Sequence, residues 1–68
     1  MTPIFYHTST CPQCKMVEML LKKNNIVYES IEDVDAILKK GITHTPALEV
    51  DGQIMFGKDI ISWINNKR

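Results

Sequence analysis

The stretch Thr10-Cys11-Pro12-Gln13-Cys14-Lys15 contains both cysteines of this 68-residue chain. The apolar run Ile4-Phe5-Tyr6 precedes it, and a segment with helical spacing of apolar residues follows it. Two thiols separated by two residues, between a strand and a helix, can open and close a disulfide with little movement of the chain. In a chain that has no signs of secretion, this spacing is typical of a redox-active pair. The stretch therefore predicts thiol–disulfide exchange.

A purely structural disulfide is the alternative interpretation of the two cysteines. The stabilisation from closing a loop grows with the size of the loop, and this loop contains only Pro12 and Gln13. Structural disulfides are also rare in cytoplasmic proteins. We therefore expect the pair to react rather than to brace the fold.

The composition bounds the class of protein. The chain is 44% hydrophobic and 24% charged, as expected for a globular domain, and its eight basic and eight acidic residues cancel. This balance gives no electrostatic case for nucleic acid or an anionic membrane as a partner. No segment approaches the ~20 apolar residues of a membrane span, and the first residues lack the pattern of a signal peptide. We expect a single domain over residues 1–68 that is cytoplasmic and monomeric.

The spacing of apolar residues predicts seven elements in the order β-α-β-α-β-β-α. Strands are expected at residues 3–7, 26–31, 47–50 and 53–56. The first helix is expected to begin at Pro12, and the second and third after caps at Asp33 and Asp59. The expected inner faces of the three helices are Cys14, Val17, Leu20 and Leu21; Val34, Ile37 and Leu38; and Ile60, Ile61 and Ile64.

Turn residues and connection rules then predict how these elements assemble. Gly41 is expected to end the second helix, and Asp51-Gly52 predicts a tight hairpin. A strand–helix–strand order implies a parallel pair with a right-handed crossover. A four-stranded mixed sheet with helices on both faces follows, which is a thioredoxin fold near its minimal size. Side chains expected to pack against the core are Met16, Met19, Met55 and Trp63, while Lys67 and Arg68 are expected to oppose the dipole of the last helix.

The chain resembles the glutaredoxin family over nearly its whole length. The resemblance rests on Cys11-Pro12-Gln13-Cys14 opening a helix, Thr45-Pro46 opening the third strand and Gly57-Lys58-Asp59 opening the last helix. It implies that Cys11 attacks, and that a cis peptide before Pro46 faces it, although a proline can also simply start an edge strand. It also implies that residues 57–59 help to bind glutathione as co-substrate, without a permanently bound cofactor. The substrate-binding residues it implies are Pro12, Gln13, Thr45, Pro46, Gly57, Lys58 and Asp59.

The chain departs from the usual family pattern at several positions. Gln13 stands where the family usually has Tyr, His44-Thr45 stands where it has Thr-Val, and Phe56 takes the place of the first of two glycines. With Gln13 before the second cysteine and the single glycine Gly57, the chain is also similar to redoxins that donate electrons to ribonucleotide reductase and are reduced by thioredoxin reductase. Disulfide-containing proteins are the expected substrates, and the electron donor is either glutathione or thioredoxin reductase.

The expected chemistry depends on the beginning of the first helix. The thiolate is the nucleophile, and an ordinary cysteine has a pKa of ~8.5. Helix N-termini and Cys-x-x-Cys motifs lower such values to roughly 3.5–7.5, which favours Cys11 as the attacking sulfur. Cys14 lies further inside the helix on its apolar face and is expected to be buried, protonated and responsible for displacing the product. Lys15 is expected to be a bystander.

The sequence agrees less well with three metal-binding functions than with thiol–disulfide exchange. Copper-handling domains also place Cys-x-x-Cys after a first strand, but their usual order is β-α-β-β-α-β. An iron–sulfur-bridged dimer is disfavoured by Pro12, and a zinc site that adds His7 and His44 lacks a second paired motif. Tyr6 either contacts substrate at the mouth of a cleft or packs on the sheet. Asp59 either caps a helix or binds the amino group of glutathione.

Overall fold

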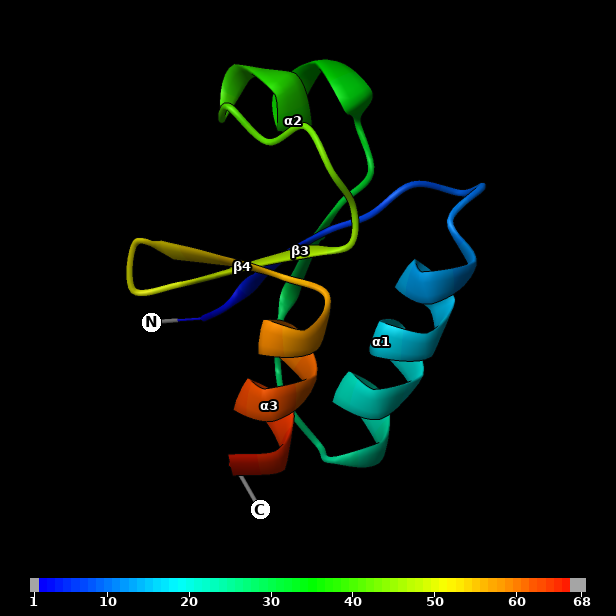
Figure 1. Cartoon of the computed structure of the whole chain (residues 1–68), viewed down its shortest axis with the longest axis vertical. Coiled ribbons are helices and arrows are strands. Elements are labelled where there is room, and N and C mark those ends of the chain that lie inside the picture. The colour runs from blue at the N-terminus through cyan, green and yellow to red at the C-terminus, as the bar shows by residue number, and fades with distance from the viewer. Residues whose placement is uncertain (1, 67–68) are drawn as a thin grey trace.

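The structure, a computed structural model, describes residues 2–66 and has the predicted order of elements. Figure 1 shows helices on both faces of the sheet. The expectation for Lys67 and Arg68 lies outside the described residues. The elements are β1 (Ile4–Tyr6), α1 (Pro12–Lys23), β2 (Glu29–Ile31), α2 (Val34–Lys39), β3 (Ala47–Val50), β4 (Gln53–Phe56) and α3 (Lys58–Asn66).

The sheet has the strand order β2-β1-β3-β4. β1 runs parallel to β2 and antiparallel to β3, and β3 and β4 form the predicted hairpin. Asp51 and Gly52 both have positive φ angles, 50° and 83°, as a tight hairpin turn of this kind requires. This topology leads the chain from the central strand β1 directly into the loop before α1. The cysteine pair therefore lies next to the end of a central strand.

The core is divided between the two faces of the sheet by the alternation along β1. Phe5 and Tyr6 are neighbours with 0% exposure, and they belong to different clusters. The Phe5 cluster lies under α1 and α3, and the Tyr6 cluster lies under α2. The first contains Cys14, Val17, Leu21, Leu48, Ile60 and Ile64, and the second contains Ile37, Ile42 and Ala47. β1 is thus the doubly covered strand that its consecutive apolar residues predict.

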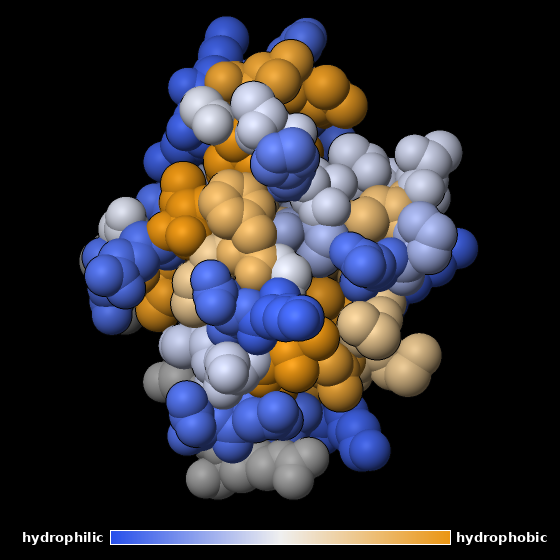
Figure 2. Space-filling model, viewed as in Figure 1, coloured by the Kyte–Doolittle hydropathy of each residue, from blue (hydrophilic) through white to orange (hydrophobic). Residues whose placement is uncertain are grey.

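The predicted inner face of α2 is wrong at two of its three positions. Ile37 is buried, but Val34 and Leu38 are 55% and 56% exposed. α2 has only six residues, so it turns one side chain into the core, and Ile42 in the following loop fills the adjacent space. Hydrophobic side chains consequently reach the surface over α2 (Figure 2).

Predictions for the other side chains of the helices are partly confirmed. Met16 and Met19 were expected to pack against the core but are 45% and 66% exposed. Met55 and Trp63 do pack against the Phe5 cluster. On the predicted inner faces, Leu20 and Ile61 are half-buried, and Cys14, Val17, Leu21, Ile60 and Ile64 are buried.

The first strand is one residue shorter at each end than the expected 3–7, and two other boundaries differ more. The second strand was expected over residues 26–31 and begins only at Glu29, because the Ile26 N–H donates to Leu21 O at 2.9 Å and so closes α1. Asp59 does not cap α3: the helix begins at Lys58, and Gly57 O accepts from the N–H groups of Ile60 and Ile61. Gly57, with φ 48°, makes the turn from β4 into α3 directly, which leaves no separate cap residue.

Two other helix ends are as predicted. Asp33 caps α2, since its Oδ1 accepts from the Asp35 N–H at 3.1 Å. Gly41 follows the end of α2 with φ 79°, in the left-handed region that glycine favours. Among residues 2–66, no helix is long and apolar enough to cross a membrane.

Candidate active site

Cys11 occupies the N-cap position of α1. Its backbone is extended, Pro12 follows at the first helical position, and its Sγ accepts a hydrogen bond from the Cys14 N–H at 3.1 Å. The sulfur thus takes the place of the hydroxyl or carboxylate oxygen that usually caps a helix. Pro12 has no N–H to leave unpaired, so it suits the position after the cap. The N–H and the positive end of the helix dipole both favour a thiolate at Cys11 when the pair is reduced.

Cys14 lies one turn into the helix and is linked to Cys11 by a disulfide, with the two Cα atoms 5.2 Å apart. The two sulfurs have different surroundings. Cys11 is only partly buried, whereas Cys14 is 2% exposed and belongs to the apolar Phe5 cluster. The predicted burial of Cys14 is confirmed. Lys15 is exposed, and its N–H donates to Cys11 O at 3.4 Å as part of the helix.

A groove of about 140 Å³ separates the start of α1 from the start of α3. Its wall brings together residues from three separate stretches of the sequence: Gln13, Met16, Val17, Pro46, Gly57, Lys58 and Ile61. The Thr45–Pro46 peptide is cis, as the resemblance implied, and Pro46 is buried at the entrance to β3. Four of the predicted substrate-binding residues therefore share this groove.

The other predicted binding residues lie around this groove or apart from it. Pro12 lines a second hollow of about 290 Å³ with Cys11, Ser9, Thr10 and Lys15. Thr45 is half-buried beside Pro46, and Asp59 is exposed in the first turn of α3. Met16 and Ile61 also line the groove, although they were not among the predicted substrate-binding residues. Their positions, three residues after Gln13 and after Lys58, are the signal that would have placed them on the same helix faces.

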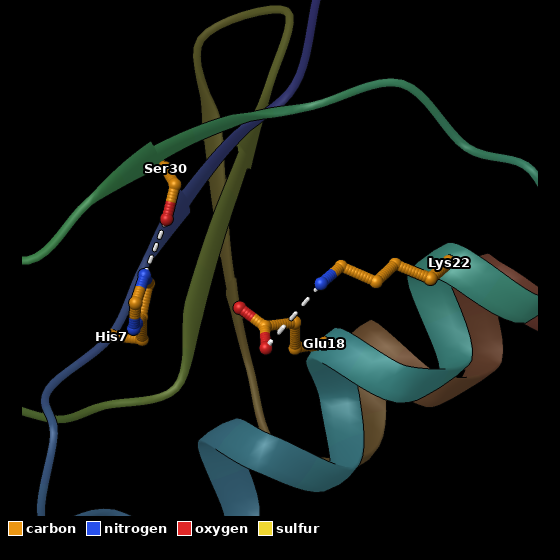
Figure 3. Close-up of polar contacts among 4 residues, drawn as sticks. All are labelled: His7, Glu18, Lys22 and Ser30. Atoms are coloured by element: carbon orange, nitrogen blue, oxygen red, sulfur yellow. Dashed lines mark hydrogen bonds and ion pairs between the residues drawn. The ribbon is translucent and has the colours of Figure 1, made fainter.

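A third hollow of about 320 Å³ lies at the end of β1 and reaches Cys14. Its lining residues, besides Cys14, are the polar or charged residues His7, Thr8, Ser9, Lys15, Glu18 and Glu32. Of these, His7 is hydrogen-bonded through Nε2 to Ser30 Oγ, and Glu18 pairs with Lys22 at 3.9 Å (Figure 3). As a functional residue, His7 was predicted only as a candidate metal ligand. Its position two residues after Phe5 on one strand face was the available signal.

Tyr6 lies on the opposite face of the sheet, away from the cysteines. It is fully buried, and its hydroxyl donates to Glu49 Oε1 at 2.7 Å. Burial, with the nearby Glu49 carboxylate, raises the pKa of Tyr6 to about 12. The hydrogen bond from Tyr6 lowers the pKa of Glu49, and Lys40, with its Nζ 3.5 Å from Oε1, adds to this effect. Of the two interpretations of Tyr6, packing is therefore right and substrate contact is wrong.

The zinc hypothesis is contradicted by the arrangement of the two histidines. His7 stacks on Phe5, with ring centroids 4.9 Å apart, whereas His44 meets the edge of Phe56 at 6.3 Å. In the part of the chain from 2 to 66, no group of three or more His, Cys, Asp or Glu residues could hold a metal ion.

Comparisons with known proteins agree with this geometry. Two similar solved structures are those of the thioredoxin-like protein BC3987 and of a mutant of it. The first is 26% identical with a TM-score of 0.79, covering 98% of this chain and 100% of that one. The mutant is 27% identical with a TM-score of 0.76, covering 94% and 96%. No curated protein sequence matches significantly.

The match to a family model spans most of the chain. The model described as Glutaredoxin matches residues 4–55, a range that contains the cysteine pair, the cis-proline and the whole sheet except for Phe56. The chain therefore belongs to the glutaredoxin family, has a thioredoxin-like fold and is a thiol–disulfide oxidoreductase.

Proposed function

We propose that this protein reduces disulfides of proteins, and mixed disulfides with glutathione, through both cysteines in turn. The observation that carries this proposal is the difference between the two sulfurs. Cys11 is partly exposed at a helix N-cap and accepts an N–H hydrogen bond, while Cys14 is 2% exposed behind it. The exposed sulfur suits attack on an incoming disulfide, and the buried one suits an internal second step.

The electron balance follows from two exchanges. The Cys11 thiolate attacks one sulfur of the substrate disulfide, forms a mixed disulfide and releases the other sulfur as a thiolate. Cys14 then attacks Cys11 Sγ, breaks the mixed disulfide and releases the second substrate thiol. The two cysteines give up two electrons and form the disulfide seen in the structure, which the electron donor must reduce before the next cycle.

The surroundings of Cys11 suggest how a substrate is held. The Thr45 backbone, before the cis-proline, is available to pair with an extended segment of a protein substrate. Gln13, Pro46, Gly57 and Lys58 line the adjacent groove, and Pro12 lines the hollow in front of Cys11. Lys58 and Asp59, both exposed at the start of α3, can serve the carboxylate and amino groups of glutathione. We propose a monomer that acts in the cytoplasm.

The electron donor is the finer part of this proposal. We favour glutathione, because Gly57 and Lys58 line the groove and Asp59 follows them. A specific observation supports the alternative donor, thioredoxin reductase. Phe56 is 40% exposed and meets His44 edge-on, so its ring occupies space that a glycine at this position would leave open. A protein donor does not need that space.

Two reduction assays on the oxidised protein separate the donors. One supplies glutathione with its reductase, and the other supplies thioredoxin reductase with NADPH. We expect faster turnover with glutathione, and a clear preference for thioredoxin reductase would reverse this assignment. Phe56→Gly should increase the rate with glutathione and leave the other rate unchanged.

Two cysteine variants test the roles of the sulfurs. Cys11→Ser should abolish all exchange, and Cys14→Ser should trap the mixed disulfide with a protein substrate. Activity retained by Cys11→Ser would overturn the assignment. Tight one-to-one Cu(I) binding by a reduced protein that lacks reductase activity would instead support a metal carrier.

A further inference from the structure

The two sulfurs of the disulfide open into different hollows. Cys11 lines the hollow that also contains Pro12, and Cys14 lines the polar cavity at the end of β1. The hollow beside Pro12 suits the approach of a substrate, because Cys11 is the partly exposed sulfur. The cavity at the end of β1 connects the buried Cys14 with polar side chains that the exchange of sulfurs alone does not use.

Cys14 needs a proton acceptor at one step. In the reduced protein it lies in an apolar cluster with Phe5 and Leu48, and such surroundings disfavour a thiolate. It must nevertheless lose its proton to attack Cys11 in the mixed disulfide. The N–H at the helix start favours an anion at Cys11, and it is the Cys14 N–H itself, so it cannot do the same for Cys14.

Three side chains in the cavity can accept a proton: His7, Glu18 and Glu32. Carboxylates ordinarily titrate about four units below a thiol, whereas imidazole lies about two units below it, so imidazole is the better match for this transfer. Glu18 is also engaged with Lys22. The cavity, at about 320 Å³, has ample room for a water molecule to bridge an acceptor and Cys14.

His7 is also held in place on several sides. Its ring stacks on Phe5 with an interplanar angle of 16°, and its backbone N–H donates to Ile31 O at 3.1 Å. The hydrogen bond between Nε2 and Ser30 Oγ fixes the remaining rotation of the ring (Figure 3). When Nε2–H donates to Ser30, Nδ1 carries the free lone pair.

We propose that His7 is the proton acceptor for Cys14 in the second exchange, which deepens and rests on the two-step function proposed above. His7 Nδ1 takes the proton from the Cys14 thiol, directly or through one water. The resulting Cys14 thiolate bonds to Cys11 Sγ, and the bond from Cys11 to the substrate sulfur breaks. The substrate leaves as a thiolate and recovers the proton from the imidazolium, so charge and electrons balance.

Three other charged groups face His7. Glu18 and Lys15 approach from α1, and Glu32 approaches from the segment after β2. Ser30, on β2, is a positioning residue.

A stepwise reaction with the chromogenic aromatic disulfide DTNB tests the proposal. One equivalent releases a first coloured thiolate when Cys11 attacks and a second when Cys14 displaces the other half. We expect His7→Gln to slow the second release by about tenfold or more and to leave the first unchanged. The second rate should depend on pH in the unmodified protein, and His7→Gln should change this dependence.

His44→Gln is the matched control, because it removes the other histidine, which lines none of the three hollows described. It should leave the second release unchanged. Added imidazole should restore the second rate in His7→Ala, and Ser30→Ala should show a smaller loss than His7→Gln. A thermal unfolding curve for each variant shows whether the fold is retained.

The possible failures are distinguishable. If Cys14→Ser still releases the second thiolate, the two-step function itself is wrong. If Cys14→Ser blocks that release but His7→Gln keeps both its rate and its pH profile, only the role of His7 is overturned. If Glu18→Gln, rather than His7→Gln, slows the second release, the acceptor is the carboxylate and the proposal is also overturned.

Discussion

The two faces of the sheet are built from adjacent residues of β1 and are used differently. On the Phe5 face, α1 and α3 cover an apolar cluster that includes one of the two reacting sulfurs. On the Tyr6 face, α2 covers a second cluster that ends in the polar network of Tyr6, Glu49 and Lys40. Both aromatic rings are fully buried.

This difference shows how a small domain can combine reactivity with stability. A buried cysteine needs apolar neighbours, so the polar groups of the reactive face lie at its edge, where β1 ends in His7. The other face carries no reacting group and holds a charged network at its edge. We therefore expect changes on the Phe5 face to affect exchange and stability together, and changes on the Tyr6 face to affect stability alone.

The largest effect is expected on the reactive face. Phe5→Ala removes a fully buried ring that contacts the Cys14 cluster and stacks on His7, and it should cost about 3–5 kcal/mol of unfolding free energy. Exchange activity should fall with it. Denaturant unfolding and a disulfide-reduction assay measure both. Because Phe5→Ala can prevent folding, Phe5→Leu is the second variant; a folded Phe5→Leu protein that loses stability but keeps full activity would contradict the coupling.

The next effect is a loss of stability at high pH from the other face. The pKa of Tyr6 is about 12 when folded and 10.0 in the reference state, so its contribution is complete below pH 10 and is lost as the pH rises toward 12. The slope is about 1.4 kcal/mol per pH unit for a single group. Unfolding midpoints measured across this range should fall less steeply in Tyr6→Phe. Equal slopes in the two proteins would show that Tyr6 ionises freely in the fold.

Tyr6→Phe sharpens the comparison at neutral pH. It removes one hydrogen bond to the Glu49 carboxylate and keeps the ring, so we expect a loss of about 1.5–3 kcal/mol. The exchange rate should not change, because the hydroxyl lies across the sheet from the cysteines. A reduction assay on folded protein tests this separation, and a large loss of activity would mean that the two faces are coupled.

These expectations depend on parts of the structure that the sequence predicted to different degrees. The bounds of β3 and β4 are as predicted because Asp51-Gly52 sets the hairpin and its register. The start of α1 follows from Pro12, and the cis-proline followed only from the family resemblance. Val34 and Leu38 were placed wrongly because apolar periodicity assumes a helix long enough to bury a stripe, and α2 has six residues.

The polar cavity shows why part of the site escaped prediction. His7, Cys14 and Glu32 come from three separate segments, and only the parallel pairing of β1 with β2 brings the last of them near the first. No local pattern marks such a group. The groove, by contrast, was largely predictable, because Thr45-Pro46 and Gly57-Lys58 each form a short motif.

The smallest expected effect concerns the edge of the Tyr6 face at low pH. The pKa of Glu49 is lowered chiefly by the Tyr6 hydrogen bond, so the folded state favours the carboxylate. Its contribution is therefore present above the reference value of 4.5 and is lost as the pH falls through the lowered value.

Lys40→Gln removes only a half-exposed ion pair and should cost about 0.2–1 kcal/mol at neutral pH. Glu49→Gln should flatten the acid limb of the stability curve more than Lys40→Gln does. The reason is that the buried Tyr6 hydroxyl lowers the pKa of the Glu49 carboxyl more than the solvated Lys40 ammonium does. Acid unfolding of the two variants decides the order. An equal or larger change in Lys40→Gln would mean that the ion pair with Lys40, rather than the hydrogen bond from Tyr6, stabilises the Glu49 carboxylate most.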